Sequence, residues 1–133
     1  MVTESRLIFL VKDPHWTFLW WEFPIWVQAS IRAQINKEKG LLAIRVYDVT
    51  HILFNGSNAH SSFYIDVSKE FDHYYLNILA SDRNYLAEIG IKYPEGPFMY
   101  QGPFQPLVRS NTIYLPRDHA SEATGNSWST ITL

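Results

Sequence analysis

Hydrophobic and polar positions alternate along most of the chain, and this pattern predicts short β-strands. A continuous apolar run from Leu7 to Val11 is typical of a strand that is covered on both faces. In the next strand, residues 16–23, successive side chains would point to opposite faces. One face would carry Trp16, Phe18, Trp20 and Glu22, and the other would carry Thr17, Leu19, Trp21 and Phe23. Because the first of these faces ends in a charged residue, we expect it to be exposed, and we assign Trp21 and Phe23 to the core.

The period changes to that of a helix over residues 25–39. Val27, Ile31 and Ile35 recur every four residues, which places one apolar stripe on the helix surface. Pro24 suits the first turn of a helix, and Gly40 just after the last residue is a common C-terminal signal. One amphipathic helix is therefore predicted between the second and third strands.

After the helix, period-two alternation returns in segments separated by polar turn signals. Five further strands are predicted, near residues 42–48, 63–67, 74–78, 85–91 and 107–115. The Tyr and Phe side chains of these later strands are assigned mostly to the core. One helix cannot supply the repeated crossovers of a parallel sheet. About seven short strands therefore predict a mainly β fold, an Ig-like antiparallel β-sandwich with one inserted α-helix.

The sandwich is predicted to be a single domain over residues 1–118, followed by a polar C-terminal tail over residues 119–133. Near the end of this domain, residues 93–106 hold four of the seven prolines together with several aromatic residues. Such a stiffened loop either packs back on the sandwich or forms a recognition surface. The tail is polar apart from Trp128, whose role the sequence leaves open.

Seven segments of the chain carry a resemblance to a known family. They are Asp13–Trp16, Trp20–Glu22, Leu42–Thr50, Asn58–Ser61, Tyr75–Ile78, Tyr85–Gly90 and Arg109–Asn111. In their order and spacing they resemble a bacterial domain-of-unknown-function family, numbered 4912, over about residues 7 to 118. That family has no established activity, so the resemblance implies a shared domain and no particular reaction. The strand at Tyr85 also resembles the tyrosine-containing strand of immunoglobulin-like and fibronectin-like sandwiches, which is an analogy of fold alone.

Composition narrows the classes of partner. The 133 residues are 16% aromatic and 18% charged, with a formal net charge of −2, so no global positive field would hold nucleic acid or a membrane surface. The absence of cysteine removes thiolate metal sites, and the glycines fit no phosphate-binding motif, so we expect neither a metal nor a cofactor. Without a secretory signal or a long apolar run, the chain is expected to be cytoplasmic.

The aromatic excess supplies the candidate site. Trp16 and Trp20 could stack on a ligand that Glu22 orients by hydrogen bonds, and Tyr100 and Phe104 could add contacts from the proline-rich loop. The leading interpretation is a non-catalytic binding module that presents aromatic residues to a protein or a polysaccharide. His60 is a further candidate, because a Ser–His pair can activate a nucleophile. A histidine that ties down its own loop is nevertheless favoured, since neighbouring residues on a strand point to opposite faces.

Two other interpretations stay open. One is a glycosidase-like hydrolase that uses Glu22 and Asp48, whose carboxyl groups would have to stand about 5 to 10 Å apart across a cleft. The other is a self-associating structural domain, in which the aromatic faces close a homodimer and no external ligand exists. An enzyme would need a concave cleft, whereas a flat aromatic patch favours binding.

Overall fold

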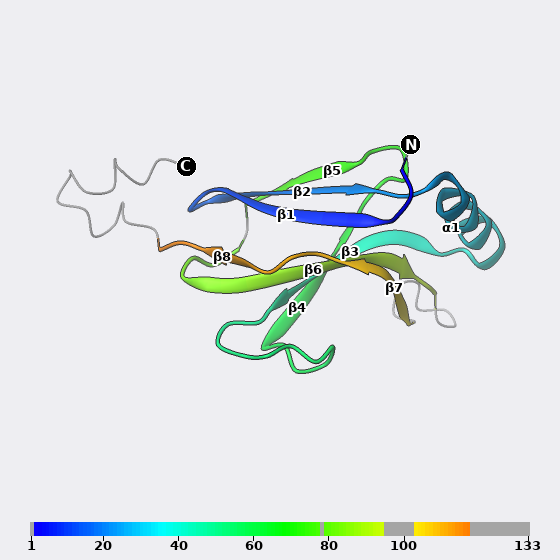
Figure 1. Ribbon diagram of the computed structural model, residues 1–133. Coiled ribbons are helices and arrows are strands. Elements are labelled where there is room, and N and C mark those ends of the chain that lie inside the picture. Colours follow the sequence, from blue (N-terminus) through cyan, green and yellow to red (C-terminus); the bar gives the residue numbers. More distant parts are fainter. Residues whose placement is uncertain (1, 78, 95–102, 118–133) are drawn as a thin grey trace.

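Two antiparallel β-sheets pack face to face in the computed structural model, and one helix lies at the end of the sandwich (Figure 1). The structure describes residues 2–77, 79–94 and 103–117, and these statements concern that part of the chain. The predicted positions Ile78, Tyr100 and Trp128 and the tail over residues 119–133 lie outside the described residues.

The first sheet has three strands in the order β1-β2-β5. They are β1 (Arg6–Asp13), β2 (Trp16–Glu22) and β5 (His73–Leu76). Alternate side chains of these strands face the second sheet and are buried, among them Phe9, Leu19 and Trp21. Phe23, just after β2, is buried as well, so the assignment of Trp21 and Phe23 to the core is confirmed.

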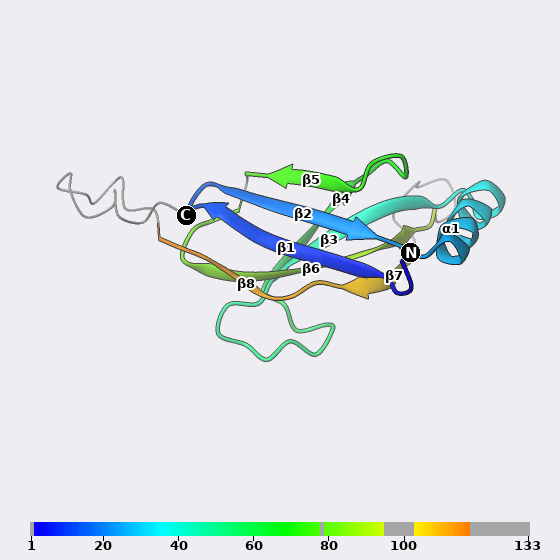
Figure 2. The same ribbon diagram turned by 45° about the horizontal axis from the view of Figure 1, so that its top comes forward.

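The second sheet has five strands, four of them in the order β4-β3-β6-β7, while β8 pairs with the start of β6. They are β3 (Leu41–Asp48), β4 (Ser61–Asp66), β6 (Arg83–Lys92), β7 (Phe104–Arg109) and β8 (Ile113–Leu115). Ile44, Val46 and Ile89 are fully buried and join the first sheet's inner side chains in one core. Figure 2 shows the two layers from a second direction.

The predicted Ig-like antiparallel sandwich is confirmed, but with eight described strands instead of seven. The expected seventh strand is interrupted between β7 and β8. There the backbone N–H of Ser110 donates to the carbonyl of Ala87 at 2.8 Å, and the Ser110 hydroxyl oxygen accepts from the Ala87 N–H at 2.9 Å. One serine therefore satisfies both backbone groups of Ala87 where the regular ladder stops.

Tyr85, near the start of β6, makes a contact typical of Ig-like sandwiches. Its hydroxyl donates to the carbonyl oxygen of Ala80, five residues upstream, at 3.0 Å, and its ring is buried. This is the arrangement known as a tyrosine corner, which anchors the connection between two strands of opposite sheets. The resemblance of the Tyr85 strand to that of Ig-like folds is thus confirmed in an individual hydrogen bond.

Helix α1 (Ile25–Glu38) closes one end of the sandwich. It follows Pro24, and the residue after its last turn is Lys39, whose φ of 57° is left-handed. Ile31 is buried, and Val27 and Ile35 are partly buried against the core, so the predicted apolar stripe is confirmed. Within the described ranges, no helix is long and apolar enough to cross a membrane.

The assignment of the later Tyr side chains mostly to the core is wrong. Tyr64, Tyr74, Tyr75 and Tyr114 are exposed, whereas Tyr47 and Tyr85 are buried. Period two shows that successive side chains alternate between faces, but it does not show which face another layer covers. The exposed tyrosines lie on strands at the margins of the sheets, where solvent reaches them.

One side chain joins the two sheets. Asn111 lies in the short connection between β7 and β8, beside the edge of β1 that β2 leaves free. Its amide nitrogen donates to the carbonyl oxygen of Phe9 at 2.8 Å, and its amide oxygen accepts from the N–H of Phe9 at 2.9 Å. The amide thus replaces a missing neighbouring strand and holds β1 against the second sheet.

We expect Asn111→Ala to lower the free energy of unfolding by about 2 kcal/mol, because both partly buried backbone groups of Phe9 lose their partner. Asn111→Asp should also destabilise the fold, since a carboxylate cannot donate to the Phe9 carbonyl. Urea unfolding measures both variants. Asn36→Ala on the exposed side of α1 is the control and should cause no loss, and an equal stability of Asn111→Ala and wild type would refute the sheet-joining role.

Candidate functional site

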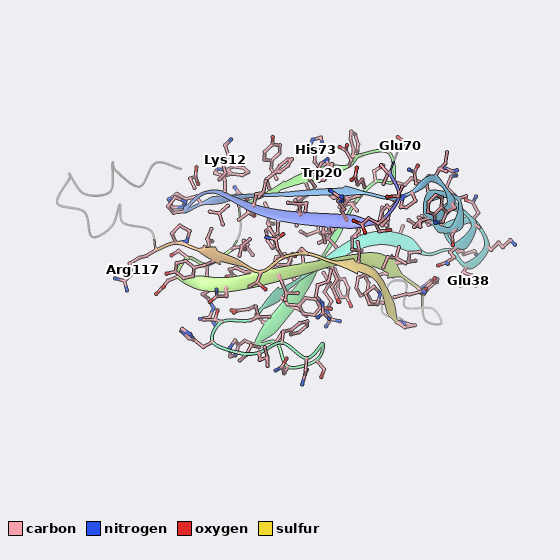
Figure 3. All side chains as sticks on the ribbon, in the orientation of Figure 1. Lys12, Trp20, Glu38, Glu70, His73 and Arg117 are labelled. Atoms are coloured by element: carbon pink, nitrogen blue, oxygen red, sulfur yellow. The ribbon has the colours of Figure 1, made fainter. Side chains whose placement is uncertain are left out.

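The outer side of the three-stranded sheet carries two rows of apolar and aromatic side chains. Cross-strand pairing aligns Leu10 with Phe18 and Phe18 with Tyr75 in one row. The second row consists of Ile8, Trp20 and His73. Figure 3 shows Trp20, His73 and nearby Lys12 on the side of this sheet that faces away from the second layer. We call these two rows, together with Trp16 at the start of β2, the aromatic face.

The rings of the aromatic face contact one another. The centroid of Phe18 lies 4.9 Å from that of Tyr75 and 5.9 Å from that of His73. The Lys12 ammonium lies 5.7 Å from the centre of the Tyr75 ring, within the range of a cation–π contact. Because Tyr75 is 53% exposed and Leu10 50% exposed, the face combines mutual packing with substantial apolar area open to solvent.

Three of the predicted site residues lie on this face. Trp16, Trp20 and Glu22 alternate with buried residues along β2, and Trp16 is 39% exposed. The Glu22 carboxylate lies 3.5 Å from the Arg6 side chain, so its charge is balanced at the margin of the sheet. Glu22 can therefore contribute polarity at the rim, while the rings supply the contact area.

Trp20 also lines a cleft of about 510 Å³ at the end of the sandwich next to α1. Its apolar lining includes Trp21, Phe23 and Ile31, and residues 69–72 form one wall. Arg32, Lys69, Glu70 and Asp72 place charges of both signs around it. The cleft adjoins the aromatic face, because Trp20 belongs to both.

His60 and Phe104 lie elsewhere, with the second sheet. The His60 ring Nε2 is 2.7 Å from the carbonyl oxygen of Thr50, a contact that ties together the two ends of the loop between β3 and β4. Phe104 packs edge-on against Tyr64, with 5.4 Å between ring centroids. The structure therefore divides the predicted site residues between two sheets, and Tyr100 lies outside the described residues.

Asp48 belongs to a buried polar network at the end of β3. Its carboxylate accepts from the Thr50 N–H at 3.1 Å and from the Thr50 hydroxyl at 2.6 Å, and it forms an ion pair with Arg83. The Thr50 hydroxyl oxygen in turn accepts from the Asn84 N–H at 3.0 Å. These bonds connect the end of β3 to the start of β6, so Asp48 stabilises the second sheet.

The structure does not bring Glu22 and Asp48 together. Glu22 ends β2 just before α1, whereas Asp48 ends β3, which starts after α1 and runs away from it. At roughly 3.3 Å per residue, β3 carries Asp48 about 25 Å along the sandwich. Glu22 pairs with Arg6 and Asp48 with Arg83, so the two carboxylates do not flank a common cleft as the glycosidase interpretation requires.

Sequence reasoning missed the β1 and β5 contributions to the aromatic face. Ile8 and Leu10 were part of a run that suggested burial on both sides, and Tyr75 was grouped with core residues. His73 and Tyr75 are two positions apart on β5, so their side chains lie on the same side of that strand. This alternation is the signal that the sequence contains. Their place beside β2 depends on a strand pairing between segments more than fifty residues apart, and no local pattern reveals it.

Comparisons with known proteins give a family and several distant structural likenesses. The model of the family described as "Domain of unknown function (DUF4912)" matches residues 3–125. No curated protein matches the chain.

The chain is similar to the structure described as "Solution structures of the fn3 domain of human collagen alpha-1(XX) chain", with 16% identity, a TM-score of 0.48, and coverage of 96% of this chain and 92% of that one. It is also similar to one described as "Myokine structure", with 13% identity, a TM-score of 0.44, and coverage of 86% and 100%. Neither likeness bears on function, because unrelated functions share such folds.

The network around Asp48 predicts how stability changes in acid. Burial by itself would raise the pKa of Asp48, but the hydrogen bonds from Arg83 and Thr50 outweigh burial and hold this pKa below its ordinary value. The pairing therefore contributes stability above an unfolded-state pKa of about 3.9, and the contribution is lost as pH falls through the lower folded-state pKa. We expect the free energy of unfolding of Asp48→Asn to depend less on pH in this range than that of wild type.

Urea unfolding at a series of pH values from about 6 to about 2 measures this difference. Glu70→Gln provides the control, because it removes an exposed carboxylate that lies outside the Asp48 network. If wild type and Asp48→Asn lose stability equally on acidification, the pairing of Asp48 does not govern the acid response.

Proposed function

Because the chain belongs to the family described as Domain of unknown function (DUF4912), a description that names no activity, we propose a function from its surface. The protein is a non-catalytic interaction module that binds a partner protein through the aromatic face. The observation that carries this proposal is the alignment of two rows of apolar and aromatic side chains across β1, β2 and β5.

The aromatic face has the composition of a protein interface. Aromatic anchors such as Trp16, Trp20 and Tyr75 are the side chains that most often dominate binding energy. Charged groups lie at the margin, where Lys12 contacts the Tyr75 ring and Arg6 pairs with Glu22. An apolar centre with a polar rim is the usual arrangement where one protein covers another.

The same strands that present the aromatic face also form the core. Phe9, Leu19 and Trp21 are buried on the inner side of β1 and β2, so the backbone beneath the exposed rings is held in place. A surface that is already ordered loses little conformational entropy on binding. The face is therefore suited to binding without a large rearrangement.

A protein partner is favoured over a polysaccharide by the aliphatic side chains at the β1 end of both rows. Ile8 and Leu10 occupy one end of each row, and aliphatic groups match apolar side chains better than sugar hydroxyls. Sugar binding would need hydrogen-bonding groups around the stacked ring, but the nearby Glu22 carboxylate already pairs with Arg6. Polysaccharide binding is one of the outcomes that the experiment described next distinguishes.

We expect the double variant Trp16→Ala, Tyr75→Ala to weaken partner binding by at least about tenfold, because it removes two aromatic anchors. Affinity capture from the native cell lysate, followed by a binding titration with each captured protein, measures the change. The matched control is Trp26→Ala, since Trp26 is 58% exposed on α1 and lies outside the aromatic face.

Several results would contradict this proposal. An unchanged affinity of the folded double variant for every captured protein would refute a role for the aromatic face. Retardation of wild type, but not of the double variant, in gels that contain a soluble polysaccharide would move the ligand to the carbohydrate class. A homodimer that the double variant abolishes, detected by sedimentation at two concentrations, would favour self-association.

A further inference from the structure

The outer side of the second sheet carries a row in which cations alternate with aromatic rings. Arg109 lies 4.9 Å from the ring centre of Phe54, and the Phe54 and Tyr47 centroids are 4.8 Å apart. The Arg45 guanidinium lies between two tyrosine rings, 5.0 Å from the centre of Tyr47 and 5.1 Å from that of Tyr64. This row faces away from the first sheet, so it is separate from the aromatic face.

The charges of this row are only partly balanced. Arg109 pairs with the buried Glu88 at 3.1 Å. Lys92 also belongs to the row, because its ammonium lies 4.9 Å from the centre of the Tyr64 ring, and it pairs with Asp66 at 2.9 Å. For Arg45, no carboxylate of the described residues lies within ion-pair distance. Arg45 is therefore the cation of this row that lacks a carboxylate partner among the described residues.

Arg45 is held in a fixed orientation. Its Nε–H donates to the hydroxyl oxygen of Ser62 at 3.0 Å, while its guanidinium also contacts the rings of Tyr47 and Tyr64. Tyr47 is itself anchored, because its hydroxyl donates to Glu88 at 2.6 Å. Burial and this hydrogen bond raise the pKa of Tyr47, so its hydroxyl keeps the proton that it donates.

Two side chains of this arrangement can donate hydrogen bonds to a ligand. The terminal N–H groups of a guanidinium match the two oxygens of a carboxylate, and a stacked arginine loses little side-chain entropy when it binds one. The Ser62 hydroxyl, which accepts from Arg45, still has its own proton to donate. Arg45 and Ser62 therefore offer adjacent donors from neighbouring strands.

We propose that Arg45 and Ser62 form a binding site for a carboxylate side chain of an acidic partner peptide. A single carboxylate matches the single charge of Arg45, whereas a phosphate group, with a charge of about −1.5 to −2, would leave excess negative charge near Glu88 and Asp66. The site lies on the opposite sheet from the aromatic face and does not depend on the function proposed for that face.

The test is an NMR titration of the isotope-labelled full chain with a tetraglutamate peptide, a tetraglutamine peptide and inorganic phosphate. Tetraglutamate should shift the Arg45 Nε–H and the amides of Ser62 and Tyr64, and tetraglutamine should not. Arg45→Gln should weaken tetraglutamate binding by about tenfold or more, because a hydrogen-bonded charge pair is lost. Arg32→Gln removes the same charge from α1 and should leave the affinity unchanged.

Ser62→Ala retains Arg45, so it tests the same site even if Arg45→Gln does not fold. It should weaken tetraglutamate binding by about threefold, because one neutral donor is lost. The proposal is overturned if tetraglutamate causes no shift at Arg45, if Arg32→Gln and Arg45→Gln weaken binding equally, or if phosphate binds in place of tetraglutamate. The Trp16→Ala, Tyr75→Ala variant should bind tetraglutamate like wild type, which separates this site from the aromatic face.

Discussion

The paired hydrogen bonds between the Asn111 side chain and the backbone of Phe9 hold the edge of one sheet against the other. An edge strand has backbone groups without a neighbouring strand, and burying them unpaired would be costly. The break between β7 and β8 places the Asn111 amide beside that edge. With β1 in position, its inner side chains complete the core and its outer ones join the aromatic face.

Two differently built surfaces follow from this packing. Each strand has one side in the core, so its other side is left for solvent or a partner. On the three-stranded sheet the outer side carries rings and aliphatic groups with few charges. On the five-stranded sheet, charged groups lie between rings, and ion pairs balance two of the three cations. The first surface suits apolar contact and the second suits a charged group.

Local alternation along β2 predicted one part of the candidate site, and the pairing of distant strands determined the other part. The parity of β2 placed Trp16, Trp20 and Glu22 on one side and Trp21 on the other, because alternation is a property of any strand. The contribution of His73 and Tyr75 depended on the pairing of β5 with β2, and the separation of His60 and Phe104 from the tryptophans depended on which sheet each segment joined. Local pattern also gives no distance between Glu22 and Asp48, because this distance depends on the two sheets to which β2 and β3 belong.

The sequence by itself determined the strands, the helix with its buried Ile31, the antiparallel sandwich class and the family resemblance. These depend on residue period, turn residues and short motifs, which act over a few neighbouring positions. Only the tertiary structure decided which tyrosines are exposed, that Asn111 joins the sheets, and that Arg45 lies between two rings without a carboxylate partner among the described residues. These features arise from contacts between segments that are distant in the chain. Packing and charge balance select such neighbours, and local residue preferences do not.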